Sequence, residues 1–233
     1  MVYFNPRYLI YMAPAILAML AAQWYVRSTY QHWGKVSLRS RLRGAEVVER
    51  LKSGSGLHQV RVEQISGQLT DHYDPRNKVL KLSSDVYTGS SVASVAIAAH
   101  ELGHALQDQK DYLPLRFRSF LIPAVNVGST LGWILIMVGL LINVTQLAWL
   151  GVIAFSGGAV FAAATLPVEW NASQRAKKML LDSGIIQGEK EKQGVQRVLN
   201  AAALTYVASL FTAVMQLLYW VSVVSGAGGS RRR

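Results

Sequence analysis

Two histidines and a glutamate stand close together in this sequence, in an order that suits metal-assisted hydrolysis. His100 and His104 are four positions apart, and Glu101 directly follows the first histidine. On a helix with 3.6 residues per turn, both imidazoles project from one face and can share one ion. The H-E-x-x-H order is typical of zinc peptidases, in which the glutamate takes a proton from zinc-bound water and passes it to the leaving amine. The pattern predicts Zn2+ as cofactor, His100 and His104 as ligands and Glu101 as the catalytic base.

The competing interpretation of this motif is a helix that carries two incidental histidines. Small apolar residues flank both histidines, and an imidazole without a partner would be poorly satisfied there. Gly103 also lies inside the motif, although glycine in a helix interior costs about 1 kcal/mol relative to alanine. We therefore interpret the motif as functional, and we expect another part of the chain to approach the helix closely at Gly103.

A catalytic zinc site needs a third protein ligand and one open position. The chain contains no cysteine, so any metal must be bound by His, Asp or Glu side chains. The longer zinc signature, H-E-x-x-H-x-x-G-x-x-H, is absent because Gln107 and Lys110 occupy its last two defined positions. The third ligand must then come from elsewhere in the chain.

Glu169 is the best candidate for that ligand. It is the first charged residue after 50 uncharged positions, and Pro167 just before it suits the first turn of a helix. The alternative interpretation is an acid stabilised by a helix N-terminus. Other acceptable third ligands are His72, Asp108 and Asp111.

Two further features near these residues allow a role in catalysis. Asn171 and Arg175 follow Glu169 at helical spacing, so they could orient it or stabilise an oxyanion, although surface roles suit them equally well. Residues 78–82 alternate in polarity like a strand. If this is an edge strand, it could bind a peptide substrate by β-augmentation, but a purely structural strand fits the pattern as well.

Long apolar segments place this chain in a membrane. Four stretches contain no charged side chain, and each is long enough to cross a hydrocarbon core as a helix. They are residues 8–26, 119–145, 146–168 and 201–224. The middle two are continuous, so we expect a helical hairpin that turns near residues 143–146. A soluble protein of 233 residues could not enclose four such helices.

The charge distribution predicts the orientation. Residues 27–118 contain 14 Lys and Arg, residues 169–200 contain 6, and the turn of the hairpin contains none. By the positive-inside rule, both polar segments face the cytoplasm. The net charge of +11 does not indicate a nucleic-acid partner, because no recognition motif accompanies it.

The polar segment after the first span predicts a small α+β unit. We expect a helix over residues 38–52, a strand over 59–63, a turn-rich loop over 71–77, the strand over 78–82 and a helix to residue 109 with Ser91 as its N-cap. The predicted organisation is an anchor (1–28), a catalytic α+β segment (29–118), a transmembrane hairpin (119–168), a cytoplasmic helical segment with the third zinc ligand (169–200), and a last transmembrane helix with a basic tail (201–233). The fold class is thus a predominantly α membrane protein with about four transmembrane helices and a small zincin-like α+β cytoplasmic unit.

Several motifs along the chain resemble one known family. They are LTDHYDPR (69–76), LKLS (80–83), VY (86–87), AAHELGHALQ (98–107) and LPVEWNAS (166–173). Together and in this order they resemble the bacterial YugP-type membrane zinc metallopeptidases. The resemblance implies a metal-dependent endopeptidase of the bacterial inner membrane and supports Glu169 as the third ligand. In the related HtpX and CAAX-protease branch an Asp usually follows this Glu by four residues, whereas Ser173 stands here.

These observations favour a multi-pass zinc endopeptidase that cuts protein or peptide substrates, membrane proteins among them, near the cytoplasmic face. An intramembrane protease is disfavoured because the motif segment is too short and too closely flanked by charge to span. The alternative from another class is a non-catalytic membrane scaffold or adaptor with a structural metal site, for which four protein ligands would be expected. The lipid bilayer is a further partner, and an oligomer or partner membrane proteins are compatible with the sequence.

Overall fold

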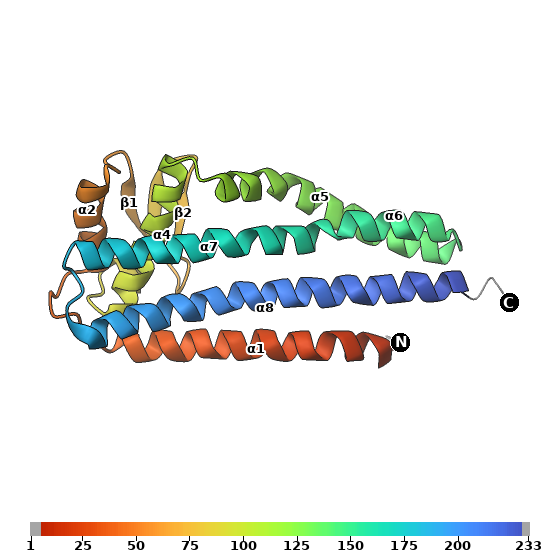
Figure 1. Ribbon diagram of the computed structural model, residues 1–233, viewed down its shortest axis with the longest axis horizontal. Helices are drawn as coiled ribbons and strands as arrows, with labels where there is room; N and C mark the ends of the chain where they lie inside the picture. The colour runs from red at the N-terminus through yellow and green to blue at the C-terminus, as the bar shows by residue number, and fades with distance from the viewer. Residues whose placement is uncertain (1–5, 230–233) are drawn as a thin grey trace. The chain divides into compact units, whose positions relative to one another are not determined.

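A computed structural model describes residues 6–229 and shows a mostly helical chain with one small sheet (Figure 1). The elements in chain order are α1 (Pro6–Gly34), α2 (Gly44–Ser55), β1 (Arg61–Ile65), β2 (His72–Asp74), β3 (Val79–Ser83), α3 (Ser84–Tyr87), α4 (Val92–Gln109), α5 (Leu113–Leu141), α6 (Thr145–Phe155), α7 (Gly157–Asp182) and α8 (Gly188–Gly229).

Four helical stretches are long and apolar enough to cross a membrane, as the sequence predicted. They are Pro6–Gly34, Leu113–Leu141, Thr145–Asp182 (α6 followed by α7) and Gly188–Ala227. Only 17% of each apolar window is buried, which suits contact with lipid rather than with a protein core.

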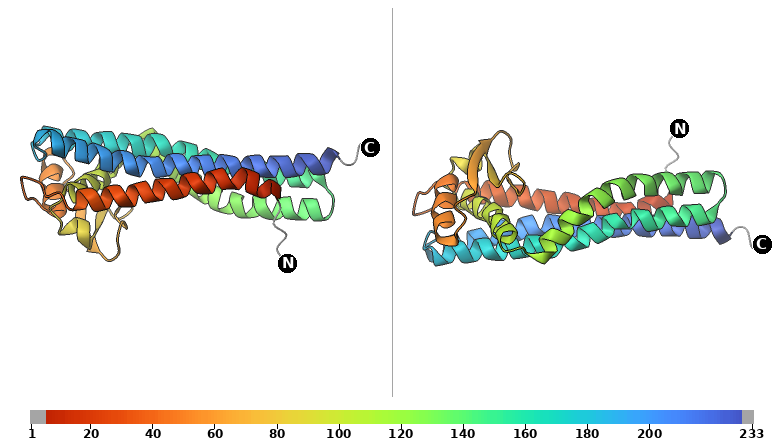
Figure 2. Two further views of the ribbon diagram at one scale, coloured as in Figure 1. Left: turned by 90° about the horizontal axis from the view of Figure 1, so that it is seen from below. Right: turned by 90° about the horizontal axis from the view of Figure 1, so that it is seen from above.

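One compact unit contains only helical segments, from residues 6–22, 116–166 and 205–229. Its α5–α6 hairpin, green in Figure 2, turns at Asn143, which has a positive φ of 59°. This position agrees with the predicted turn at 143–146. The hairpin packs tightly, because a Cβ on Gly132 would lie 2.8 Å from the carbonyl oxygen of Gly151. Small residues at such contacts let membrane helices approach closely.

The second compact unit, residues 23–115 and 167–204, holds the sheet and the larger core. All 13 acidic residues of the chain belong to it, whereas within residues 6–229 the charged residues of the helical unit are Arg7, Arg116 and Arg118. Charges are costly inside a bilayer, so an uneven distribution of this kind is typical of membrane proteins. The two polar segments that the sequence analysis distinguished belong to this one unit.

The sheet has the order β1-β3-β2, with β1 parallel and β2 antiparallel to β3. Of the two interpretations of residues 78–82, the structure agrees with the purely structural strand, because β3 is paired on both sides and is mostly buried, so it is not an edge strand. The predicted loop over 71–77 also contains the strand β2, which is only three residues long and too short to show an alternating pattern.

Two predicted helix starts differ from the structure. Residues 38–43 precede α2 without helical structure, and α2 begins at Gly44. Pro167 lies within α7 rather than in a first turn, since the helix continues from Gly157 to Asp182. A proline inside a helix removes one backbone hydrogen bond, which transmembrane helices tolerate. The basic tail, Arg231–Arg233, lies outside the described residues.

Candidate metal centre

Helix α4 positions the two histidines of the motif as predicted. Ser91 caps this helix, since its side chain accepts a hydrogen bond from the Ser94 backbone N–H. His100 and His104 then lie on one face, with their ring centroids 4.9 Å apart. Both imidazoles are therefore able to contact the same ion.

Helix α7 brings the Glu169 carboxylate to the same point. Its Oε2 lies 3.2 Å from Nε2 of His100 and 3.4 Å from Nε2 of His104. One ligand atom from each of these three residues lies within 4.8 Å of the other two, and among residues 6–229 no fourth His, Asp or Glu joins the group. Glu169 is only 3% exposed, so the cluster has a buried carboxylate at its centre.

The close approach expected at Gly103 is made by α7. A Cβ built on Gly103 would lie 2.6 Å from the carbonyl oxygen of Ala172 and 3.2 Å from its Cα. Contacts of that length are with backbone, which cannot move aside like a flexible side chain. Glycine inside the zinc motif thus permits the helix spacing that brings Glu169 to the two histidines.

The second nitrogen of each imidazole has its own partner. Nδ1 of His100 lies 3.2 Å from the Ser173 hydroxyl, and Nδ1 of His104 lies 3.0 Å from Oε1 of Gln107. Ser173 therefore contacts a metal-ligand candidate from the position where the related branch has Asp. With both Nδ1 atoms occupied, the Nε2 atoms are the ones directed to Glu169.

The hydrogen bonds around Gln107 determine which nitrogen of His104 carries a proton. Nε of Arg175 can only donate, so the atom of Asn171 that it contacts at 2.6 Å must be the amide oxygen. Gln107 donates its NH2 to that oxygen and to the carbonyl of Val168, at 3.0 and 2.7 Å. Its own oxygen then faces His104 and can only accept, so Nδ1 of His104 bears the hydrogen.

The hydrogen on Nδ1 of His104 bears on whether these three residues suit a metal ion. With Nδ1 protonated, a neutral His104 presents the lone pair of Nε2 to the Glu169 carboxylate, and the two would repel each other. The contact is favourable only if a proton or a metal cation lies between them. Two imidazoles and one carboxylate match the donor set of catalytic zinc sites, so the residues fit zinc.

Burial and neighbouring charges shift the pKa values of Glu101 and His104 on α4. Burial raises the pKa of Glu101, against the opposing effect of the two imidazoles. Burial alone would lower the pKa of His104, but its hydrogen bond to Glu169 and the charges of Glu101 and Glu169 outweigh this, and the pKa is raised. Glu101 thus lies next to the cluster in an environment that favours its holding a proton.

The other candidate third ligands have different partners. His72 is exposed on β2, with Nδ1 2.8 Å from the carbonyl oxygen of Thr70. Asp108 accepts hydrogen bonds from the Tyr73 hydroxyl and from Lys78. Neither these two nor Asp111 belongs to the three-residue cluster.

Asn171 and Arg175 hydrogen-bond to each other, and Asn171 connects through Gln107 to His104. Gln107 is the residue of this site that the sequence analysis overlooked, since it figured there only as the residue replacing a signature glycine. Its position one helical turn after His104 was the available signal.

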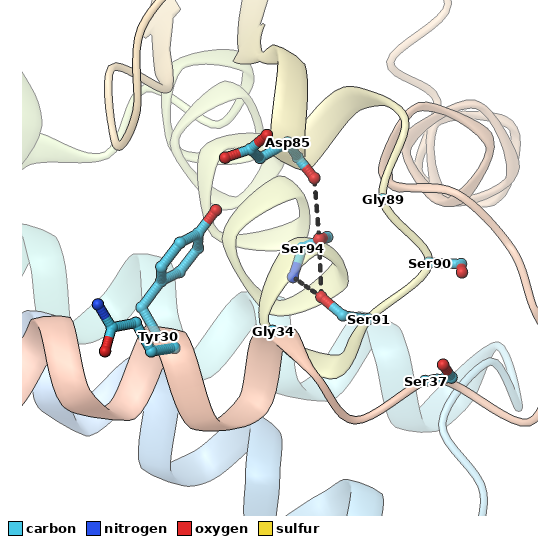
Figure 3. A pocket seen from close by; sticks show the side chains of 9 residues that line it. Tyr30, Gly34, Ser37, Asp85, Gly89, Ser90, Ser91 and Ser94 are labelled. Atoms are coloured by element: carbon cyan, nitrogen blue, oxygen red, sulfur yellow. Dashed lines mark hydrogen bonds between the residues drawn. The ribbon is translucent and has the colours of Figure 1, made fainter.

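A polar pocket of about 290 Å³ lies elsewhere in the sheet-containing unit (Figure 3). Tyr30, Asp85 and the hydroxyls of Ser91 and Ser94 line it, and Ser94 hydrogen-bonds to the backbone oxygen of Asp85. Neither histidine of the cluster lines this pocket, and neither does Glu169.

Comparison with known proteins gives this geometry a family. Residues 8–225 match the model of a family described as "Putative neutral zinc metallopeptidase". The chain belongs to this zinc metallopeptidase family. It is also 43% identical over 202 residues to "Putative membrane protease YugP" of Bacillus subtilis (strain 168), which covers 87% of this chain and 89% of that protein. No solved structure matches.

The family assignment, the candidate donor set and the four apolar helices agree on a membrane zinc metallopeptidase at the level of the family. The resemblance to the YugP-type proteins seen in the sequence is thereby confirmed.

The Gly103–Ala172 contact yields a prediction about packing. Gly103→Ala should destabilise the zinc metallopeptidase by about 1–3 kcal/mol, the usual cost of overpacking, even though alanine is the better helix former. The measurement is thermal unfolding of the detergent-purified chain. Gly54→Ala is the control, because a Cβ at Gly54 in α2 meets nothing within 4 Å. If both variants were equally stabilised, the contact would not limit the helix spacing.

Proposed function

We propose that this protein is a membrane-embedded zinc-dependent endopeptidase that hydrolyses peptide bonds of protein substrates near the cytoplasmic membrane face. In this proposal His100, His104 and Glu169 bind the zinc ion, and Glu101 is the catalytic base. The observation that carries the proposal is the convergence of two Nε2 atoms and one carboxylate oxygen beside Glu101.

Bound zinc supplies Lewis acidity, which lowers the pKa of water and polarises a carbonyl group. His100 and His104 contribute neutral imidazole donors, and Glu169 contributes the negative charge that balances part of the ion's charge. Glu101 follows the first ligand on α4, so its carboxylate can take a proton from the attacking water and deliver it to the leaving amine. The raised pKa of Glu101 makes it able to hold that proton between the two steps.

The three-ligand cluster also bears on the scaffold alternative. A structural zinc site is closed by four protein ligands, whereas a catalytic site keeps one position open. Among residues 6–229 the cluster contains three candidate ligands, and Glu101 is present although a structural site would not need it. Both features favour a peptidase over a scaffold or adaptor.

The proposed location is the bacterial inner membrane, with the sheet-containing unit in the cytoplasm. The sheet-containing unit has 18 Lys and Arg residues and 13 acidic ones, whereas the α5–α6 turn has no charged residue. The positive-inside rule therefore supports a cytoplasmic location for this unit. Substrates are proteins or peptides that reach this unit, and membrane proteins have the readiest access because the enzyme is confined to the same bilayer.

Three predictions test this proposal, and the first concerns the base. Purified wild-type protein should bind zinc and cleave an unfolded protein such as casein in detergent, whereas Glu101→Gln should bind zinc equally and lose about 10²–10⁴-fold in kcat, the usual contribution of general base catalysis. The measurements are zinc content and casein cleavage, with a zinc chelator as an inhibition control. No zinc in folded wild-type protein would refute the proposal, and zinc without cleavage by either protein would favour the scaffold.

The second prediction concerns the third ligand. Removing a residue that hydrogen-bonds to a metal ligand typically lowers metal affinity by at least about tenfold. Glu169→Ala removes a ligand itself, so its loss of zinc affinity should exceed that value. Asp108→Asn is the matched control, because Asp108 was an alternative ligand and lies outside the cluster. Affinity is measured by competition with a chelator. An unchanged affinity in Glu169→Ala, together with a loss in Asp108→Asn, would assign the third ligand to Asp108.

The third prediction concerns orientation, and it uses the absence of native cysteines. We expect a membrane-impermeant maleimide to label Gln146→Cys, in the α5–α6 hairpin, in intact spheroplasts. Gln59→Cys, in the sheet-containing unit, should react only after permeabilisation. Both positions are exposed, so burial does not explain a difference. The reverse labelling pattern would place the candidate metal centre outside the cell.

A further inference from the structure

We infer that Gln107 is a positioning residue for the metal centre, which fixes His104 in the orientation and tautomer needed to bind zinc and ties it to the helix that carries Glu169. This inference rests on the proposed function. It concerns a residue that takes no part in the H-E-x-x-H motif and does not contact the metal position itself.

The first support is burial. The Gln107 side chain is 0% exposed, although it carries a polar amide. A buried amide is costly unless its donors and acceptor are paired, so a side chain in this position is retained only with specific partners. Both donors and the oxygen of Gln107 have such partners.

The second support is the direction of these hydrogen bonds. The two donors of Gln107 are held by acceptors on α7, the Val168 carbonyl and the Asn171 amide oxygen, at 2.7 and 3.0 Å. Arg175 excludes the flipped orientation of Asn171, because it donates to the same oxygen. The Gln107 oxygen therefore has a fixed direction, 3.0 Å from Nδ1 of His104.

The consequence for the metal is specific to His104. Accepting from Nδ1–H keeps Nε2 unprotonated and aimed at the position shared with His100 and Glu169. His100 is held differently, because the Ser173 hydroxyl beside its Nδ1 can either donate or accept and does not select a tautomer. Gln107 also hydrogen-bonds from α4 to α7, so one side chain connects His104 to the helix that carries Glu169.

The test compares zinc affinities of three variants of the full-length chain in detergent, by chelator competition. Gln107→Met keeps the side-chain volume but has no acceptor for His104, and we expect about 10–100-fold weaker zinc binding, as for other partners of metal-bound histidines. Gln107→Glu restores an acceptor, and its protonated oxygen can donate to Val168, so affinity should return to the wild-type level. Gln109→Met is the matched control, because Gln109 lies on the same helix and hydrogen-bonds only to the Gly56 carbonyl, among the bonds found for residues 6–229.

The outcomes separate this inference from the proposed function. If Gln107→Met bound zinc with wild-type affinity, the inference would be overturned and the proposed function would not. The same holds if Gln107→Glu bound zinc as weakly as Gln107→Met, because Gln107 would then have only a packing role. Thermal unfolding in excess chelator shows whether each variant folds without metal. If Gln107→Met does not fold, the inference is tested with Gln107→Glu instead. A wild-type zinc affinity of Gln107→Glu supports the inference, and a zinc affinity as low as that of His104→Ala overturns it. Wild-type protein that binds zinc no better than His104→Ala would refute the proposed function itself.

Discussion

The backbone contact between α4 and α7 at Gly103 and Ala172 is the constraint on which the candidate metal centre depends. The two histidines come from one helix, and Glu169 comes from another that is 60 to 70 residues away in the sequence. Their three ligand atoms meet only because α7 lies closer to α4 than any side chain at position 103 would permit. The helix stability given up by a central glycine is offset by this geometry.

Around that contact, polar side chains of both helices direct the imidazoles. Gln107 and Ser173 occupy the Nδ1 atoms of His104 and His100, so both Nε2 atoms face the Glu169 carboxylate. With Nδ1 of His104 protonated, its Nε2 lone pair beside the buried Glu169 carboxylate is unfavourable unless a proton or a metal cation lies between them. A divalent ion bound between the candidate ligands would remove this electrostatic repulsion. Side chains held in place before the ion binds are what a metal site requires.

The division of charge explains how such a site can exist in a membrane protein. The described part of the helical unit has three arginines and no acids, and the sheet-containing unit has every acidic residue of the chain. Helix α7 contributes to both units, with apolar residues up to Val168 and the candidate ligand directly after them. In the peptidase that we propose, this division of charge keeps the polar chemistry outside the hydrocarbon region while the helical unit attaches the protein to the bilayer.

Local pattern in the sequence predicted most of the elements and the candidate site residues. The helical spacing of His100 and His104, the Ser91 cap and the four uncharged stretches follow from short-range periodicity, and the structure shows each of them. The glycine at 103 even predicted a close neighbour without naming it. Only the tertiary structure decided that Ala172 is that neighbour, that β3 is central in the sheet, and that Gln107 joins His104 to α7 through Val168 and Asn171. Those features depend on which distant segments pack together. The periodicity of a single segment does not determine the energy of such contacts.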